Sequence, residues 1–448
     1  MRWNRPRASA ALAIVVPVTG ALTLASVASG AHASSSFLAA GGEVDAVSTR
    51  TGSVVQTYGA APGEDFGASL GVDTIIRPGQ RDLVVGAPAS NPDPGGGSPF
   101  GGIILFDPAT GAELNRLAGD ALPGGPVRRF GQSSTVLGHP TGAPLSWWTY
   151  GAPGVPEAGD VGTVIVTGDQ AITEQYRIRG RKDALFGWRV MNLFEDIDGD
   201  SSRALDFAVA APLETRKKKS PERGAVYVFS TLTSRQLYRI EGPHNYARFG
   251  YALTLADDHD GDGLIDFWVS APGSAAEGVA GVVILLSSAT GAEIRRIEAP
   301  AGAEQFGFAA ASIFDLDGDG VRDLLVSAPA ADKSARKVDT GIVFAFSSVD
   351  GTELMRWQGK KKGERLGITL ASSATLAGTE QRILIVSDSK GRGVLDFFGL
   401  DGKRTRRVKG AKDSRFAQTV SGFVDLDGDG FPEFVMSRTG SDPIFVPE

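Results

Sequence analysis

Four short acidic loops in the chain carry carboxylates at alternate positions, a spacing that suits metal binding. The loops are EDIDGDSSRALD from Glu195, DHDGDGLID from Asp258 to Asp266, DLDGDGVRD from Asp315 to Asp323, and DLDGDGFPE from Asp425 to Glu433. A hard cation such as Ca²⁺ takes about six to eight oxygen ligands and needs a tight backbone bend that gathers them. Glycine permits such a bend because it has no Cβ. The loops therefore predict Ca²⁺ sites.

Three of the loops are regular: positions 1, 3, 5 and 9 are carboxylates, and position 7 would donate a backbone carbonyl. The predicted ligands are Asp258, Asp260, Asp262, Leu264 and Asp266; Asp315, Asp317, Asp319, Val321 and Asp323; and Asp425, Asp427, Asp429, Phe431 and Glu433. An EF-hand would need helical flanks and a Glu at position 12, where this chain has Val269, Val326 and Met436. We therefore expect structural calcium loops between β-strands, with affinities in the roughly millimolar range of extracellular modules.

The first loop is irregular. Asp196, Asp198 and Asp200 keep the spacing, but Ser201 replaces the glycine and the last acid, Asp206, comes two residues late. The chain is thus expected to bind three or four structural Ca²⁺ ions, depending on this loop. The alternative for all the loops is a set of plain acidic turns, but converging like charges would repel one another without a cation.

A longer repeat contains the loops, and two short motifs bound it. The Phe-Gly-like pairs are Phe66-Gly67, Phe130-Gly131, Phe186-Gly187, Phe249-Gly250, Phe306-Gly307, Leu366-Gly367 and Phe416-Ala417. The small-Ala-Pro triplets are Gly86-Ala87-Pro88, Gly151-Ala152-Pro153, Ala210-Ala211-Pro212, Ser270-Ala271-Pro272 and Ser327-Ala328-Pro329, followed by the degenerate Ser387-Asp388-Ser389 and Ser437-Arg438-Thr439. Six steps from residue 66 to residue 416 give a period of about 58 residues, longer than WD40 or kelch units.

Within one repeat the apolar pattern is that of short strands. The fifth unit reads FGFAAASIF, the acidic loop, DLLVSAP, TGIVFAFSS, a turn, and TELMRWQG, which predicts four antiparallel strands. Such sheets repeated radially leave only short edges. We expect an all-β, seven-bladed β-propeller in which the N-terminal hairpin at residues 41–59 completes the last blade. The C-terminal stretch Pro443 to Val446 could compete for one place in that blade.

The Phe-Gly start, the Gly-Ala-Pro end and the acidic loop between them resemble FG-GAP repeats, as in the β-propeller of integrin α subunits. The resemblance covers about residues 66–448 together with the closing hairpin. It implies an extracellular recognition or adhesion module that binds calcium. The chain departs from that pattern in unit six, whose loop SSATLAGTEQR has no acid cluster, and we expect it to have neither the long extra domains nor the membrane span of integrins.

The first 33 residues have the features of a secretory signal peptide. Arg2, Arg5 and Arg7 precede an apolar stretch, and Ala31-His32-Ala33 matches a cleavage site. We expect a single propeller domain at residues 34–448 in a secreted, periplasmic or cell-surface protein, the alternative being that the segment stays as a membrane anchor. The chain has no cysteine, so packing and metal rather than disulfides must hold the blades.

Basic residues gather in segments expected on the face opposite the acidic loops. The candidate ligand-binding residues are Lys217, Lys218, Lys219, Lys360, Lys361 and Lys362. A positive field there could attract an acidic polysaccharide or an anionic protein surface, although soluble loops alone would look the same. The formal net charge of −7 makes nucleic acid an unsuitable partner.

Catalysis is not the expected function. The match Gly67-Ala68-Ser69-Leu70-Gly71 does not lie between a strand and a helix, where a nucleophile elbow belongs. We expect an exported calcium-binding propeller that recognises an extracellular protein or anionic glycan. The alternatives are a propeller-type hydrolase or lyase acting on polysaccharide or lipid, and a purely structural envelope component.

Overall fold

The computed structural model describes residues 14–15, 23–24, 42–48, 54–59, 67–73, 82–88, 100–138, 146–155, 160–168, 173–200, 205–215, 221–374, 381–389, 391–410, 420–424 and 433–439. The regular secondary structure of these residues is almost entirely β-strand. Their only helical segment is the short 3₁₀ turn η2 (Ala275–Glu277).

Six four-stranded antiparallel sheets are each built from consecutive strands. They are β5 (Leu70–Asp73), β6 (Asp82–Ala87), β7 (Gly102–Phe106) and β8 (Glu113–Ala118); β9 (Ser133–Gly138), β10 (Trp147–Ala152), β11 (Val161–Gly168) and β12 (Thr173–Lys182); β13 (Val190–Asn192), β14 (Phe207–Ala211), β15 (Ala225–Phe229) and β16 (Gln236–Glu241); β17 (Leu253–Leu255), β18 (Phe267–Ala271), β19 (Val282–Leu286) and β20 (Glu293–Glu298); β21 (Ala310–Ser312), β22 (Leu324–Ala328), β23 (Ile342–Phe346) and β24 (Glu353–Gln358); and β25 (Thr369–Ala374), β26 (Gln381–Ser389), β27 (Arg392–Phe398) and β28 (Arg404–Lys409). We number these sheets as blades 1 to 6.

A further four-stranded sheet combines the two ends of the chain. Its order is β29 (Val420–Val424), β30 (Glu433–Thr439), β3 (Gly42–Ser48) and β4 (Val54–Gly59). β3 and β30 are antiparallel, with Gly42 opposite Thr439 and Ser48 opposite Glu433. A separate pair is formed by β1 (Ile14–Val15) and β2 (Thr23–Leu24). The stretch 443–446, expected as a competitor for the last blade, lies outside the described residues.

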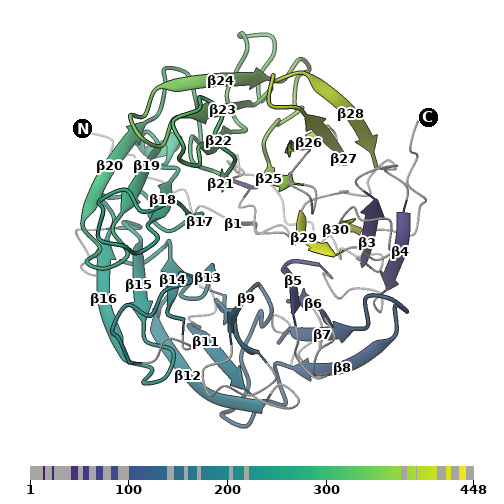
Figure 1. Cartoon of the computed structure of the whole chain (residues 1–448), viewed down its shortest axis with the longest axis vertical. Coiled ribbons are helices and arrows are strands. Elements are labelled where there is room, and N and C mark those ends of the chain that lie inside the picture. The colour runs from purple at the N-terminus through teal and green to yellow at the C-terminus, as the bar shows by residue number, and fades with distance from the viewer. Residues whose placement is uncertain are drawn as a thin grey trace, which may run out of the picture.

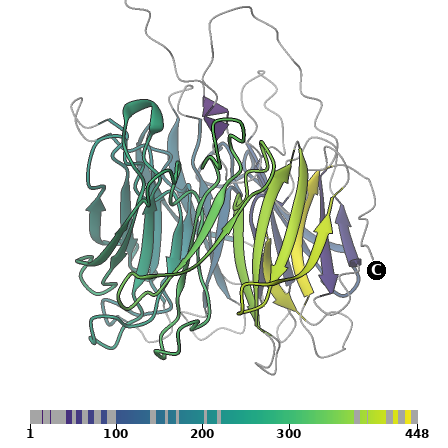
Figure 2. The same ribbon diagram turned by 90° about the horizontal axis from the view of Figure 1, so that it is seen from above.

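The sheets are arranged radially around a central axis (Figure 1), with the first strand of each blade innermost and the fourth outermost. Viewed from above, the strands run between the two faces of the ring (Figure 2). The expected all-β propeller of four-stranded antiparallel sheets is confirmed. In blade 3, every residue of β14 and β15 is buried, whereas outer strand β16 is half-exposed. The apolar middle strands therefore form the core, because neighbouring blades cover both of their faces.

The Phe-Gly pair fills the boundary between blades. Phe130 and Phe306 are completely buried; Phe130 lies in the apolar cluster of Ile103 and Leu105 from the preceding blade. Gly131 has a φ of +91°, a backbone conformation that favours glycine. Its N–H donates to the carbonyl of Gly151, the first residue of the triplet in the same blade, over 3.1 Å.

The triplet glycines allow the next blade to approach closely. A Cβ added to Gly151 would lie 2.0 Å from the carbonyl oxygen of Gly187, and one added to Gly86 would lie 2.0 Å from that of Gly131. The two motifs therefore recur because the start of each blade fits against the end of the second strand of the blade before it.

Candidate metal centres and the opposite basic face

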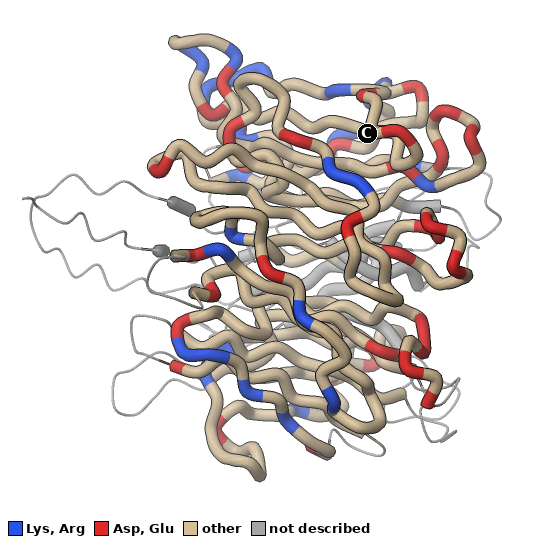
Figure 3. Tube along the Cα trace, turned by 90° about the vertical axis from the view of Figure 1, so that its left-hand side faces the viewer, with Lys and Arg blue, Asp and Glu red and all other residues tan. Residues whose placement is uncertain are grey.

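The described acidic loops connect the first and second strands of blades 3, 4 and 5. All of them lie along one face of the ring, where Figure 3 shows acidic positions concentrated at its right-hand edge. Asp425, Asp427, Asp429 and Phe431 of the predicted fourth loop lie outside the described residues. Glu433 is the first residue of β30.

Carboxylates at positions 1, 3 and 5 fold the loops through hydrogen bonds from backbone N–H groups. Asp258 accepts from Gly261 over 2.7 Å and from Gly263 over 2.9 Å; Asp315 accepts from Gly318 and Gly320 over 2.6 and 2.8 Å. The amide of Leu264 donates to Asp262. In each loop, these bonds orient the carboxylates toward one small volume.

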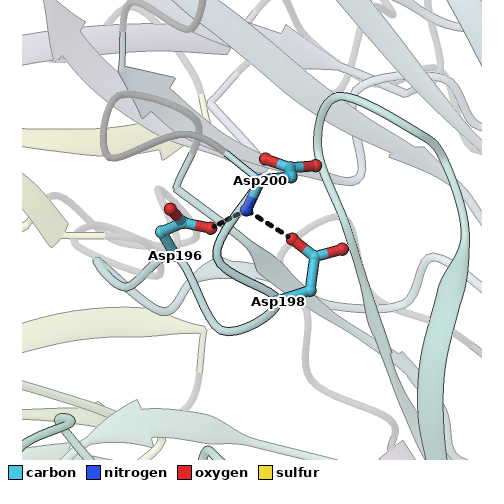
Figure 4. Close-up of side chains that lie close together, drawn as sticks. All are labelled: Asp196, Asp198 and Asp200. Atoms are coloured by element: carbon cyan, nitrogen blue, oxygen red, sulfur yellow. Dashed lines mark hydrogen bonds between the residues drawn. The ribbon is translucent and has the colours of Figure 1, made fainter.

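The equivalent bonds in the irregular loop differ. The amide of Asp200 donates to Asp196 Oδ1 over 3.1 Å and to Asp198 Oδ1 over 3.3 Å (Figure 4). The remaining oxygen Asp200 Oδ2 accepts from Ser230 Oγ over 2.9 Å. The loop with Ser201 in place of the second glycine thus still brings its three acids together.

Three carboxylate clusters result. They are Asp196, Asp198 and Asp200; Asp258, Asp260 and Asp262; and Asp315, Asp317 and Asp323, with one oxygen of each residue within 4.8 Å of the others in its cluster. Asp206 and Asp266 do not join their clusters, and Asp319 does not join the third. Oxygens that share one Ca²⁺ at about 2.4 Å cannot be more than about 5 Å apart, so the donor type and spacing of the clusters fit this ion.

The last acid of each loop is buried and braces it. Asp206, Asp266 and Asp323 are at most 1% exposed. Asp266 Oδ2 accepts from the His259 amide over 2.7 Å, and Oδ1 accepts from the Ser288 amide, in the turn after β19, over 3.2 Å. The same two acceptor bonds recur at Asp206 and Asp323. Each acid therefore ties its loop to the outer turn of its own blade.

Burial has an electrostatic cost at these acids. Desolvation raises the pKa of Asp206 to about 7 and the pKa values of Asp266 and Asp323 to about 6 each. The backbone donors offset only part of this effect. A cation beside the loop would favour the charged carboxylate, which again suits a metal centre.

The loops are also joined across blade boundaries by residues that the spacing pattern does not include. Glu195, just before the first ligand position of blade 3, accepts from the Ile265 amide of blade 4 over 3.0 Å. Asp257, in the same position of blade 4, accepts from the Arg322 amide of blade 5 over 2.7 Å. The sequence does hold a signal for this link: both loops have an extra acid before the Asp-x-Asp run, where blade 5 has Phe314.

Two basic residues in the links between blades have acidic partners. Arg128 pairs with Asp160 at 3.7 Å, and Arg248 pairs with Glu222 at 2.8 Å. Lys360, Lys361 and Lys362 are exposed and form no ion pair with any other described residue. Lys217, Lys218 and Lys219 lie outside the described residues.

Comparison with known proteins agrees with this architecture. The FG-GAP repeat family matches residues 306–346, the stretch that runs from the Phe-Gly pair of blade 5 through its acidic loop to the end of β23. The protein carries an FG-GAP repeat. The chain is also distantly similar to integrin α subunits: it is 32% identical to human integrin α-IIb over 224 residues, 47% of this chain and 20% of the relative.

Two further relatives give the same result. Identity is 30% to Drosophila melanogaster integrin α-PS2 over 201 residues, 41% of this chain and 14% of the relative. It is 28% to human integrin α-11 over 190 residues, 40% of this chain and 15% of the relative. The aligned part of the chain thus spans about a fifth or less of these relatives. Among its described residues, no helix is long and apolar enough to cross a membrane.

Proposed function

We propose that the chain is an exported, calcium-stabilised propeller that serves as a recognition or adhesion module for an extracellular partner. The observation that carries the proposal is the set of three carboxylate clusters at equivalent positions of blades 3, 4 and 5. Their equivalence supports a common function, and the similarity to integrin α subunits supports an extracellular one. Residues 1–33 would be removed on export, leaving 34–448 at the cell surface or in the medium.

The proposal includes a ring of seven blades. Antiparallel pairing of β3 with β30 supports it, because the N-terminal hairpin would supply the third and fourth strands that the C-terminal unit lacks. Closing the ring with both ends of the chain would make its stability depend on a single sheet.

Metal binding would use the clustered carboxylates together with the backbone carbonyls of Leu264 and Val321, which the sequence also predicts as ligands. Ca²⁺ would neutralise the converging acids and lock the turns between the first and second strands. The fourth loop, Asp425 to Glu433, would supply an equivalent site in the composite sheet. We propose a binding role rather than a catalytic one, since Ser69 of the Gly-x-Ser-x-Gly match is 7% exposed and donates its Oγ hydrogen to the Gly131 carbonyl over 3.0 Å.

Calorimetric titration of chelator-treated protein tests the metal sites. Three or four Ca²⁺ ions should bind per chain, and at ten times Kd each site should add roughly 1.4 kcal/mol to the free energy of unfolding. The variant D258N/D260N/D262N should lose one site, whereas E293Q/E298Q/D401N, with the same change in charge at exposed positions, should retain all of them. Equal melting temperatures in excess calcium and in chelator would contradict the proposal.

A further inference from the structure

Two basic segments meet at the end of blade 5 that lies opposite its acidic loop. One is the loop 330–341 between β22 and β23, and the other is the link 359–366 between β24 and β25. Backbone bonds join them: the Gly363 amide donates to the Val338 carbonyl over 3.0 Å, and the Arg365 amide donates to the Asp339 carbonyl over 3.0 Å. Residues about 25 positions apart therefore form one surface.

This surface presents six exposed cations, which we name the basic corner. They are Lys333, Arg336, Lys337, Lys360, Lys361 and Lys362. None of them forms an ion pair with another residue that the structure describes. In Figure 3, basic positions gather on loops at the upper left, away from the acidic right-hand edge.

Two of the three acids among these cations, Glu364 and Asp332, accept hydrogen bonds from backbone amides. Glu364 is 8% exposed, and its Oε2 accepts from the amides of Lys360 and Lys361 over 2.6 and 2.9 Å. Asp332 Oδ1 accepts from the Asp339 amide over 2.8 Å. These carboxylates hold the two segments in shape and leave the lysine side chains free to contact a ligand.

The loop itself is also held by a turn. The Lys337 amide donates to the Ser334 carbonyl over 2.8 Å, and the Lys333 amide donates to the Lys337 carbonyl over 3.0 Å. A surface whose backbone is already ordered loses less entropy when a ligand binds. The arrangement is that of a formed site rather than of a loose charged tail.

Blade 4 shows that the fold does not require these charges. Its corresponding segments, 272–281 and 299–305, contain no Lys or Arg and carry Glu277 and Glu304 instead. The first of them still forms the same kind of bridge, between Ser274 and Val279, that joins Ser334 and Lys337 in blade 5. Neither solubility nor folding requires lysine in these segments, so neither of them explains the basic corner.

The chemistry of the corner selects among polyanions. Its two segments contain no aromatic residue on which nucleotide bases could stack. None of the exposed large apolar side chains of the described residues, Val161, Phe194, Leu232, Val349 and Leu400, belongs to the two segments, so no wedge is present for insertion into a bilayer. Clustered ammonium groups with flexible stems match carboxylate or sulfate groups repeated along a sugar chain.

We infer that the basic corner binds an acidic polysaccharide. This inference names the partner chemistry for the proposed recognition role and rests on that role. Binding is electrostatic, so it weakens with salt, and it occurs on the face opposite the calcium loops.

The test measures binding of the full chain in calcium to immobilised polygalacturonate, dextran sulfate and neutral dextran. The variants K333Q/K337Q and K361Q/K362Q remove two charges each from the two segments, and their combination removes four. K403Q/R404Q is the matched control, because it removes two exposed charges at the beginning of the outer strand of blade 6, away from the corner. Circular dichroism melts check that each variant is folded.

Wild-type protein and the control should bind at least one acidic polymer and not neutral dextran. Each double variant should weaken this binding, and the combined variant should weaken it about tenfold or more with a shallower salt dependence. Equal losses in the control, unchanged affinity in the combined variant, or tighter binding to duplex DNA or to phosphatidylglycerol vesicles would overturn the inference.

Cell-wall preparations separate failure of the inference from failure of the proposed function. If wild type and the combined variant bind the walls equally, the recognition role stands and the basic corner is not its site. If the wild-type chain binds neither walls nor any polymer, the proposed recognition role fails, and this inference fails with it.

Discussion

Arg322 of blade 5 holds Asp257 of blade 4 with both its backbone and its side chain. The Arg322 amide donates to Asp257 Oδ2 over 2.7 Å, and Nε donates to Oδ1 over 2.8 Å. Nη2 donates to the Ala256 carbonyl over 2.9 Å. Burial alone would raise the pKa of Asp257, but the Arg322 bonds keep it below its usual value. Since Asp258 and Asp323 are the adjacent candidate ligands, this contact connects two candidate metal centres.

Replacing Asp257 by Asn should therefore weaken calcium binding at two loops, not one. The ion pair is partly exposed, so we expect a loss of only about 1 kcal/mol in the free energy of unfolding. Calorimetric titration should show lower affinity at the loops of blades 4 and 5. The control D350N changes an exposed acid in an outer turn; unchanged calcium binding in D257N would show that the contact is not a link between sites.

Substitution of Asp266 should have a different effect from substitution of Asp262. D266A leaves the His259 and Ser288 amides without their acceptor, at a cost of about 2 to 4 kcal/mol even when calcium is absent. D262A removes an exposed acid whose partner, the Leu264 amide, is open to solvent, so it should change the free energy of unfolding by only about 0.5 kcal/mol in chelator and by more when calcium is present. Urea unfolding of both variants in calcium and in chelator measures the contrast, and equal behaviour in chelator would refute it.

The close fit between blades predicts strong sensitivity at Gly151. In G151A the new Cβ would meet the Gly187 carbonyl oxygen at 2.0 Å, so the two blades must separate, with a destabilisation of about 3 kcal/mol. G399A is the matched control, because a Cβ there would come no closer than 3.2 Å to its neighbours. Thermal melts of both variants should show a large decrease for G151A alone; similar melting would indicate that the boundary yields easily.

Ring closure can be tested by truncation. A chain that begins at residue 34 keeps β3 and β4 and should melt like the full chain. A chain that begins at residue 60 lacks both, and it would leave β30 as an exposed edge prone to association. Size-exclusion chromatography and melting should show a monomer in the first case and aggregation or a much lower melting temperature in the second. Comparable behaviour of the two chains would contradict closure by the hairpin.

The repeat and its β character are readable from the sequence because the Phe-Gly and Gly-Ala-Pro motifs report direct contacts between blades. The clustering of the acids at positions 1 and 3 follows from their alternating spacing, whereas the structure adds position 5 in blades 3 and 4 and position 9 in blade 5. The role of Asp266 is not readable from the sequence, because a ligand and a brace for backbone amides both require a carboxylate. The sequence alone also does not predict three of the six cations in the basic corner. Lys333, Arg336 and Lys337 belong to a loop that lies beside Lys360 only in the folded blade.

The fit of the Gly187 carbonyl against Gly151 has a consequence for how such a ring can change over time. Where the earlier blade has a side chain instead, as at Ala210, the facing Gly250 lies against its methyl group. Which residue fits at a triplet or Phe-Gly position therefore depends on the residue that faces it in the adjoining repeat. If a single blade were duplicated or exchanged, its residues at the blade boundaries would not all fit the residues of its new neighbours. The unit that must be kept together during evolution is therefore the boundary formed by two adjacent repeats.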